Sequence, residues 1–266
     1  MPITTIVLNV TDVERSVAFY TDHLQAKLLG AVTEAGATLD VLTATLELVA
    51  VGPQAPASTW VPDDLQRGFR HVGFKVDRVD PYVERLKDAG VQFHLEPIEA
   101  EGGVRITFFR DPDGTLLELV ERDLQYTRVL DEAGVAAERA QGVPERPRFD
   151  HVALTVHDLH ATEASYAPLG FTPIGAIAQP HDARGFDIHY LKSGDTVLEV
   201  FTYGVDKTGR APQLDAPGYV AAVLATGTQG QAGPGAVAAP GLRPVGAVGG
   251  RTVHADGDGF TTVLGG

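Results

Sequence analysis

The sequence contains no cysteine among its 266 residues. Disulfide bridges, thiolate metal ligands and cysteine nucleophiles are therefore excluded. A metal site in this chain would have to be built from histidine, carboxylates and solvent.

Long apolar runs and basic runs are absent as well. No segment approaches the roughly 20 apolar residues that span a bilayer, and the N-terminus Met1-Pro2-Ile3-Thr4-Thr5 lacks a charged region followed by an apolar stretch. The formal net charge is -14, and no run of Lys or Arg forms a stripe that would bind phosphates. We therefore expect a cytoplasmic protein that binds neither nucleic acid nor membrane.

The chain is longer than the roughly 100 to 200 residues of a usual single domain. Hydrophobic residues make up 44% of it, which is ordinary for a globular protein with a buried core. Residues 124–148 are charged, rich in alanine and end in prolines, so we expect a helical linker there. The sequence thus predicts one domain at 1–123 and another at 149–266.

Each half contains two similar units that begin with a strand and continue through a helix into further strands. In the first unit, Ile3 to Val10 is rich in β-branched residues and is followed by Asp12, a good N-cap for an amphipathic helix. The same signals recur near residues 71, 151 and 219, and the halves are offset by 256 minus 111, or 145 residues. The last unit is degenerate, because Gly227 to Gly250 is so rich in Gly, Ala and Pro that we expect no helix there.

Two histidines and two glutamates fall at equivalent places in the second and third units. His71 and His151 open first strands, and Glu118 and Glu199 lie in last strands, at separations of 118 minus 71 (47) and 199 minus 151 (48). A lone histidine at a strand start is usually structural, but this repeated spacing predicts that the four side chains meet at one divalent metal.

Small residues accompany both histidines. Side chains alternate between the two faces of a strand, so Gly73 shares a face with His71, and Ala153 shares one with His151. We expect these small neighbours to leave room for a ligand beside the histidines.

The chain resembles the vicinal oxygen chelate superfamily, which includes glyoxalase I, bleomycin-resistance proteins, methylmalonyl-CoA epimerase and extradiol dioxygenases. The resemblance rests on the paired units, on the strand, cap and helix from Val10 to Tyr20, and on the ending Asp111-Pro112-Asp113-Gly114-Thr115-Leu116-Leu117-Glu118-Leu119. It implies an α+β fold in which four βαβββ units form two cup-shaped half-barrels, as tandem glyoxalase-like domains. Metal ligands in this superfamily come from the first and last strands of each unit.

The resemblance leaves two ways to pair the units. Sequential pairing gives two incomplete ligand sets. Pairing the second unit with the third resembles fused glyoxalase I proteins and gives one full set. The first and fourth units then hold a dead site, composed of Thr5, Glu47, Tyr219 and Val263. Glu47 is expected to line a pocket there.

Three functions remain open on this reasoning. Two imidazoles and two carboxylates suit Ni, Zn, Fe(II), Mn or Co, and a glyoxalase I-like lyase or isomerase would use the metal with Glu118 as the base that moves a proton. An Fe(II) extradiol-type dioxygenase would use His71, His151 and Glu118 and leave Glu199 surplus. A metal-free protein that binds a small molecule or antibiotic is the third reading.

The resemblance also bears on partners. It implies a small, oxygen-chelating substrate and either a monomer or a homodimer. A thiol cofactor such as glutathione follows only from family analogy, and no residue of the sequence marks a site for it.

Overall fold

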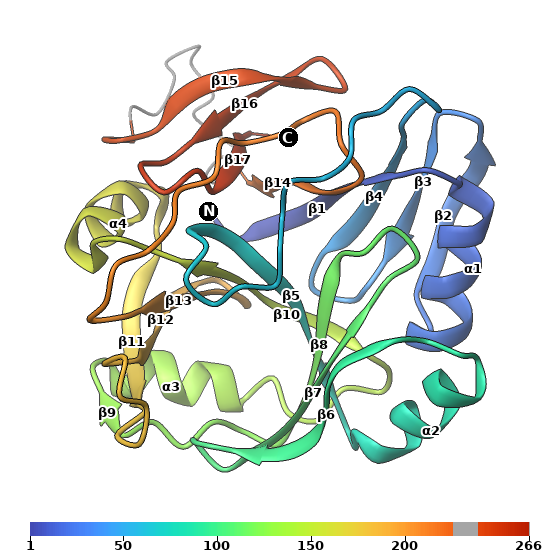
Figure 1. The fold of residues 1–266 in the computed structure, drawn as a ribbon. Helices are drawn as coiled ribbons and strands as arrows, with labels where there is room; N and C mark the ends of the chain where they lie inside the picture. Colours follow the sequence, from blue (N-terminus) through green and yellow to red (C-terminus); the bar gives the residue numbers. More distant parts are fainter. Residues whose placement is uncertain (226–238, 266) are drawn as a thin grey trace.

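The computed structural model describes residues 1–225 and 239–265, which fold into two large β-sheets with helices at the periphery (Figure 1). The helices are α1 (Val13–Leu24), α2 (Asp80–Asp88), α3 (Glu132–Arg139) and α4 (Leu159–Tyr166), which continues into a short 3-10 helix, Ala167–Leu169. None of the helices in these two ranges is both long and apolar enough to cross a membrane.

The first sheet has eight strands that come from both ends of the chain. Their spatial order is β15 (Arg243–Val248), β16 (Arg251–Ala255), β17 (Thr261–Leu264), β14 (Gly218–Leu224), β1 (Ile3–Val10), β4 (Thr45–Ala50), β3 (Gly36–Asp40) and β2 (Lys27–Thr33). It therefore combines the first unit with the fourth.

The second sheet has nine strands that come from the middle of the chain. Their order is β6 (Phe93–Ala100), β7 (Val104–Arg110), β8 (Leu116–Glu121), β5 (Gly68–Val76), β10 (Arg148–Thr155), β13 (Thr196–Thr202), β12 (Asp187–Ser193), β11 (Thr172–Ala178) and β9 (Arg128–Val129). The second unit is thus paired with the third, through antiparallel pairing of β5 and β10. The α+β fold of repeated units in two half-barrels is confirmed.

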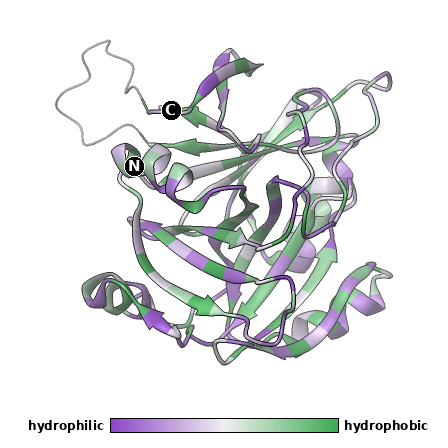
Figure 2. Ribbon diagram, turned by 60° about the vertical axis from the view of Figure 1, so that its left-hand side comes forward, coloured by the Kyte–Doolittle hydropathy of each residue, from purple (hydrophilic) through white to green (hydrophobic). Residues whose placement is uncertain are grey.

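Apolar side chains between the sheets and the helices form the main core. Hydrophobic residues run along the strands of both sheets (Figure 2), and β5 is buried at all nine positions. In that strand Val72, Phe74 and Val76 belong to the core cluster, as expected for the face that alternates with His71. Helix α1 begins where Asp12 accepts a hydrogen bond from the Arg15 amide at 2.9 Å.

Strands β2, β9, β11 and β15 were not expected from the sequence, and β9 lies in the segment that was expected to be helical. In β2, at the edge of the first sheet, six of the seven residues are exposed, so the strand carries no alternation of apolar and polar residues. Strand β11 contains a proline and a glycine, which weaken a strand pattern. The expectation that Gly227 to Gly250 contains no helix falls partly on residues 226–238, outside the described residues, and Arg243–Val248 is a strand.

The internal repeat is also visible in two buried pairs of tyrosine and aspartate. Tyr20 donates to Asp111 Oδ2 at 2.8 Å, and Tyr166 donates to Asp256 Oδ2 at 3.0 Å. The other oxygen of each aspartate accepts backbone amides of its own turn, as in the 2.7 Å bond from Thr115. Burial raises the pKa of both carboxyls from 3.8 to about 6.

These raised pKa values predict a stability that falls as pH rises. The folded state binds the proton of Asp111 more tightly than the unfolded state, so its contribution is complete below about pH 4 and is lost as pH rises through about 6. We expect Asp111→Asn to remove on the order of 3 kcal/mol of this pH-dependent change. Urea unfolding at a series of pH values measures it, with the exposed Asp77→Asn as control; an unchanged pH slope in Asp111→Asn would contradict it.

Candidate metal centre

Four acidic and imidazole side chains converge at the middle of the second sheet, on adjacent strands β8, β5, β10 and β13. One ligand atom from each lies within 4.8 Å of the others, and the residues are Glu118, His71, His151 and Glu199. The Nε2 atoms of the two histidines are 3.1 Å apart. Glu118 Oε2 lies 3.1 and 3.0 Å from these nitrogens, and Glu199 Oε2 lies 3.2 and 3.3 Å from them.

Strand register explains the convergence. On one side Gly73 lies opposite both Glu118 and His151, and on the other Ala153 lies opposite both His71 and Glu199. Each small residue thus separates one histidine from one glutamate, and the four larger side chains project from the same face around them.

The space beside Gly73 is filled by protein. A β-carbon at this position would lie 2.1 Å from Cε1 and 2.2 Å from Nε2 of His151. The expectation that this glycine leaves room for a ligand was therefore wrong, because the imidazole ring of His151 lies against the glycine backbone. The glycine instead lets His151 reach the other three side chains.

The cluster has the donor set of a cation site. All four residues are buried, with exposures of 0% for His71, 4% for His151, 5% for Glu118 and 7% for Glu199. Among the described residues, Oε2 of Glu118 and Oε2 of Glu199 have no polar neighbours other than the Nε2 atoms of the two histidines. Carboxylates are rarely buried without a compensating charge, and four converging lone pairs suit a divalent ion.

The cluster is strongly coupled electrostatically. Burial would raise the pKa of Glu118, but hydrogen bonds from His151 and His71 outweigh it and hold this pKa near 2. Burial would lower the pKa of His151, yet Glu199, Asp150 and Glu118 raise it well above 6.5. The carboxylates of Glu118 and Glu199 therefore favour positive charge at the centre of the cluster.

Two neighbouring side chains orient two members of the cluster. Asp150 Oδ2 lies 3.0 Å from His151 Nδ1, and Tyr190 donates to Glu199 Oε1 at 3.0 Å. Such partners fix ring orientation and ligand basicity in metal sites. Neither residue was predicted from the sequence. A two-residue hairpin at Gly194, which places Tyr190 opposite Glu199, was the available signal for the tyrosine.

We expect Tyr190→Phe to lower metal affinity about 10- to 100-fold, because Glu199 loses the hydroxyl that fixes its second oxygen. Competition with a chromogenic chelator measures the change. Tyr82→Phe on α2 is the matched control and should bind metal like the parent. Equal affinity in Tyr190→Phe and the parent would show that the hydroxyl does not orient the ligand.

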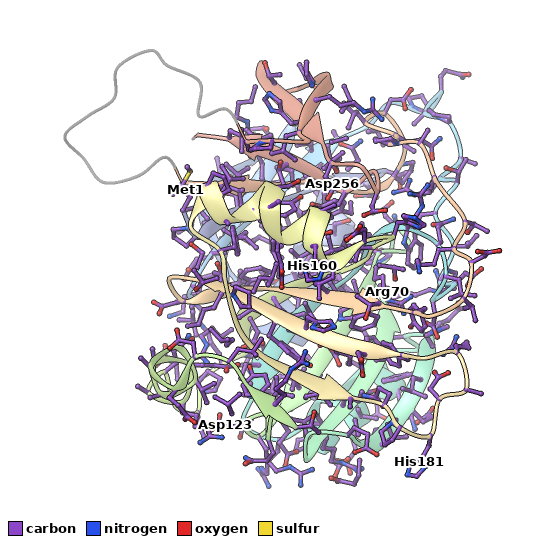
Figure 3. The ribbon with its side chains drawn as sticks, turned by 90° about the vertical axis from the view of Figure 1, so that its left-hand side faces the viewer. Met1, Arg70, Asp123, His160, His181 and Asp256 are labelled. Carbon is purple, nitrogen blue, oxygen red and sulfur yellow. The ribbon has the colours of Figure 1, made fainter. Side chains whose placement is uncertain are left out.

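The cluster lies at the wall of a cavity of about 460 Å³ in the concave face of the second sheet. Glu118, His151 and Glu199 line this cavity directly, and Arg70 lines it from the neighbouring stretch of β5. Figure 3 views the molecule from the side of β11 and β12 and labels Arg70. A small molecule in the cavity would therefore contact the cluster.

The equivalent place in the first sheet holds no such cluster. Thr5 pairs with Val223 and Thr45 in the same way as His151 pairs with Gly73 and Val197, so Thr5 is the equivalent of His151. Following the same register, Ala221, Val263 and Glu47 are the equivalents of His71, Glu118 and Glu199. The assignment of Tyr219 to the His71 position was wrong. Tyr219 matches Phe69, on whose ring it stacks at 4.0 Å, because the alignment of first strands was shifted by two residues.

The carboxylate at this place in the first sheet is already paired with a cation. Glu47 binds Arg251 through both carboxylate oxygens at 2.7 Å. Val7, which pairs with Glu47 between β1 and β4, belongs to a separate apolar cluster together with Val223 and Val263. Within residues 1–225 and 239–265, one group of side chains alone has the geometry of a metal site.

Comparisons with known proteins identify the family of this chain. Residues 3–119 match the profile of the Glyoxalase/Bleomycin resistance protein/Dioxygenase superfamily. The lactoylglutathione lyase of Salmonella typhimurium is 30% identical over 123 residues, which cover 43% of this chain and 87% of that protein. The chain belongs to this superfamily. The match to the profile ends before β10, so His151 and Glu199 lie outside it.

Three further likenesses concern a longer relative and the fold. A probable chloroplastic lactoylglutathione lyase of Arabidopsis thaliana is 33% identical over 128 residues, 44% of this chain but only 35% of the plant protein. Glyoxalase I from Zea mays superposes with a TM-score of 0.64 at 22% identity, covering 99% of this chain and 91% of that one. A putative dioxygenase from Bacillus subtilis gives 0.58 at 15% identity, with 99% and 84% covered. The structural neighbours thus share the arrangement of both sheets.

Proposed function

We propose that this chain is a metal-dependent lyase or isomerase that moves a proton within a small oxygen-chelating molecule, in the manner of glyoxalase I. The observation that carries the proposal is the buried cluster of His71, Glu118, His151 and Glu199 at the wall of a cavity. Superfamily relatives named lactoylglutathione lyases support the reaction class. The four residues would hold the ion, and Ni, Zn, Fe(II), Mn and Co all suit this donor set.

A divalent ion bound here would act as a Lewis acid for negative charge on two neighbouring substrate oxygens. The chain itself supplies the proton acceptor. Tyr190 fixes one oxygen of Glu199, whereas Glu118 has no side-chain partner besides the histidines among the described residues. Glu118 is therefore the freer carboxylate, and we assign it the role of the base that takes the proton from carbon.

The substitution Glu118→Gln tests this role. It keeps the shape of the side chain but removes the proton acceptor, and we expect the turnover rate to fall about 10²- to 10⁴-fold at equal metal occupancy. Exchange of substrate carbon-bound hydrogen with D₂O, followed by NMR on a panel of α-hydroxy carbonyl compounds, measures it.

Glu199→Gln is the matched variant, because it changes the other carboxylate of the same cluster. We expect it to lose more metal affinity and less exchange per bound metal than Glu118→Gln. The reverse result would transfer the base role to Glu199.

The same loaded protein separates the alternative functions. Oxygen uptake by the iron-loaded protein with catechols would support an Fe(II) extradiol-type dioxygenase; we expect none, because Glu199 lies within the cluster as a fourth ligand. Tight ligand binding that survives exhaustive chelation would support a metal-free binding protein.

A further inference from the structure

Aromatic rings form the cavity wall next to the metal-binding cluster. The ring of Phe108 lies 4.9 Å from that of His71, and the ring of Phe201 lies 6.0 Å from it. Phe186 packs against Phe201 at 5.2 Å and stacks on Tyr203 at 4.7 Å, and all four aromatic residues line the cavity. A molecule whose oxygens reach the cluster would therefore place its remaining atoms against rings.

The cations of the cavity already have partners. Arg70 is 8% exposed, its Nη2 lies 2.7 Å from Asp64 Oδ1, and its guanidinium carbon lies 4.8 Å from the centre of the Phe201 ring. Lys75 is 9% exposed and its Nζ donates to the backbone carbonyl of Arg122. Each cation is thus held by a group of the protein, and Arg70 Nε is a buried donor without a hydrogen-bond partner among the described residues.

Acidic side chains outnumber these two cations around the cavity. Besides the two glutamates of the cluster, they are Asp64, Asp150, Glu99 and Glu101. A divalent ion would balance Glu118 and Glu199. Asp64, Glu99 and Asp150 pair with Arg184, Arg122 and His151, so the lining offers a second anionic group little net positive charge. Moving an unpaired carboxylate from water into such a site is costly.

We propose that the substrate is uncharged apart from its two chelating oxygens and carries an aromatic or branched aliphatic body. This inference rests on the proposed function and names the substrate class for it. It also separates the chain from relatives named for lactoylglutathione, because a glutathione conjugate would bring two carboxylates into a cavity where carboxylates outnumber Arg70 and Lys75.

Two chelating probes of similar size test the proposal. They are para-methylbenzohydroxamate and para-carboxybenzohydroxamate, which offer the same two oxygens to the metal and differ in one charge. Calorimetric titration into the full-length protein, loaded with Ni or Zn, should show the methyl compound binding at least about tenfold tighter.

A charge added to the cavity provides the matched comparison. Ile98 lines the cavity and is 40% exposed, so Ile98→Lys places an ammonium group there. This charge should reduce or reverse the difference in affinity between the methyl probe and the carboxylate probe. Val143→Lys adds the same charge at a position that is 77% exposed and outside the cavity lining. It should leave the preference unchanged.

The outcomes distinguish the inference from the function on which it rests. Equal or tighter binding of the carboxylate by the parent protein would overturn the substrate class while leaving the metal site standing. Absence of metal-dependent binding for both probes would overturn the proposed function, and the substrate class with it. A preference that Val143→Lys shifts as much as Ile98→Lys would show that overall charge, and not the cavity, sets it.

Discussion

Replacement of His71 or His151 with alanine is expected to reduce the metal content of the reconstituted protein from about one equivalent to near zero. Each substitution removes one of four converging ligand atoms. The loss of affinity should exceed the roughly 10- to 100-fold that outer partners of metal ligands contribute. Elemental mass spectrometry after reconstitution and desalting measures it.

Metal binding should also increase the stability of the protein, because an ion that binds only the folded state raises the free energy of unfolding. At a metal concentration of about 100 times Kd the parent should gain roughly 2.7 kcal/mol, and both alanine variants should gain almost nothing. His94→Ala, which alters an exposed histidine on β6, is the control. A parent protein that takes up none of the five candidate ions would remove the metal centre altogether.

Gly73→Ala is expected to damage both the fold and the site, although it adds only one methyl group. The new carbon would lie 2.1 Å from the His151 ring. The ring cannot turn away freely, since its Nδ1 is held 3.0 Å from Asp150. Overpacking of this kind costs about 1 to 3 kcal/mol, and a displaced His151 would lower metal affinity together with stability.

Chemical denaturation and metal titration of the Gly73→Ala variant check both effects. Gly257→Ala is the matched control, because a β-carbon at Gly257 would meet no atom within 4 Å. A Gly73→Ala protein that is as stable as the parent and binds metal equally well would mean that His151 reaches the cluster by another arrangement.

The sequence predicted the convergence of the four side chains because it records a repeat. Nearly equal spacing of His71 with Glu118 (47) and of His151 with Glu199 (48) places them in equivalent strands, and the alternation of side chains places them on one face. Pairing of the second unit with the third followed from the completeness of the ligand set, and the antiparallel contact of β5 with β10 confirms it.

The features that the sequence did not reveal depend on register and on contacts between distant segments. Tyr219 was aligned with His71 because it opens the apolar run of the fourth unit, and only the observed pairing with Leu8 places it two residues earlier. Glu47 was expected to line a pocket. Its partner Arg251 lies 204 residues away, and no local pattern indicates such a contact.

The interleaving of units described for the two sheets determines how the metal site assembles. Each half of the chain brings one histidine and one glutamate to the cluster, and two ligands alone would leave most coordination positions to water. The covalent connection through residues 124–148 keeps the halves at an effective concentration of about millimolar or higher. The four side chains thus come together within one molecule, so the affinity of a metal bound there would not depend on protein concentration. A single cut in that segment would make metal retention depend on reassociation of the two fragments.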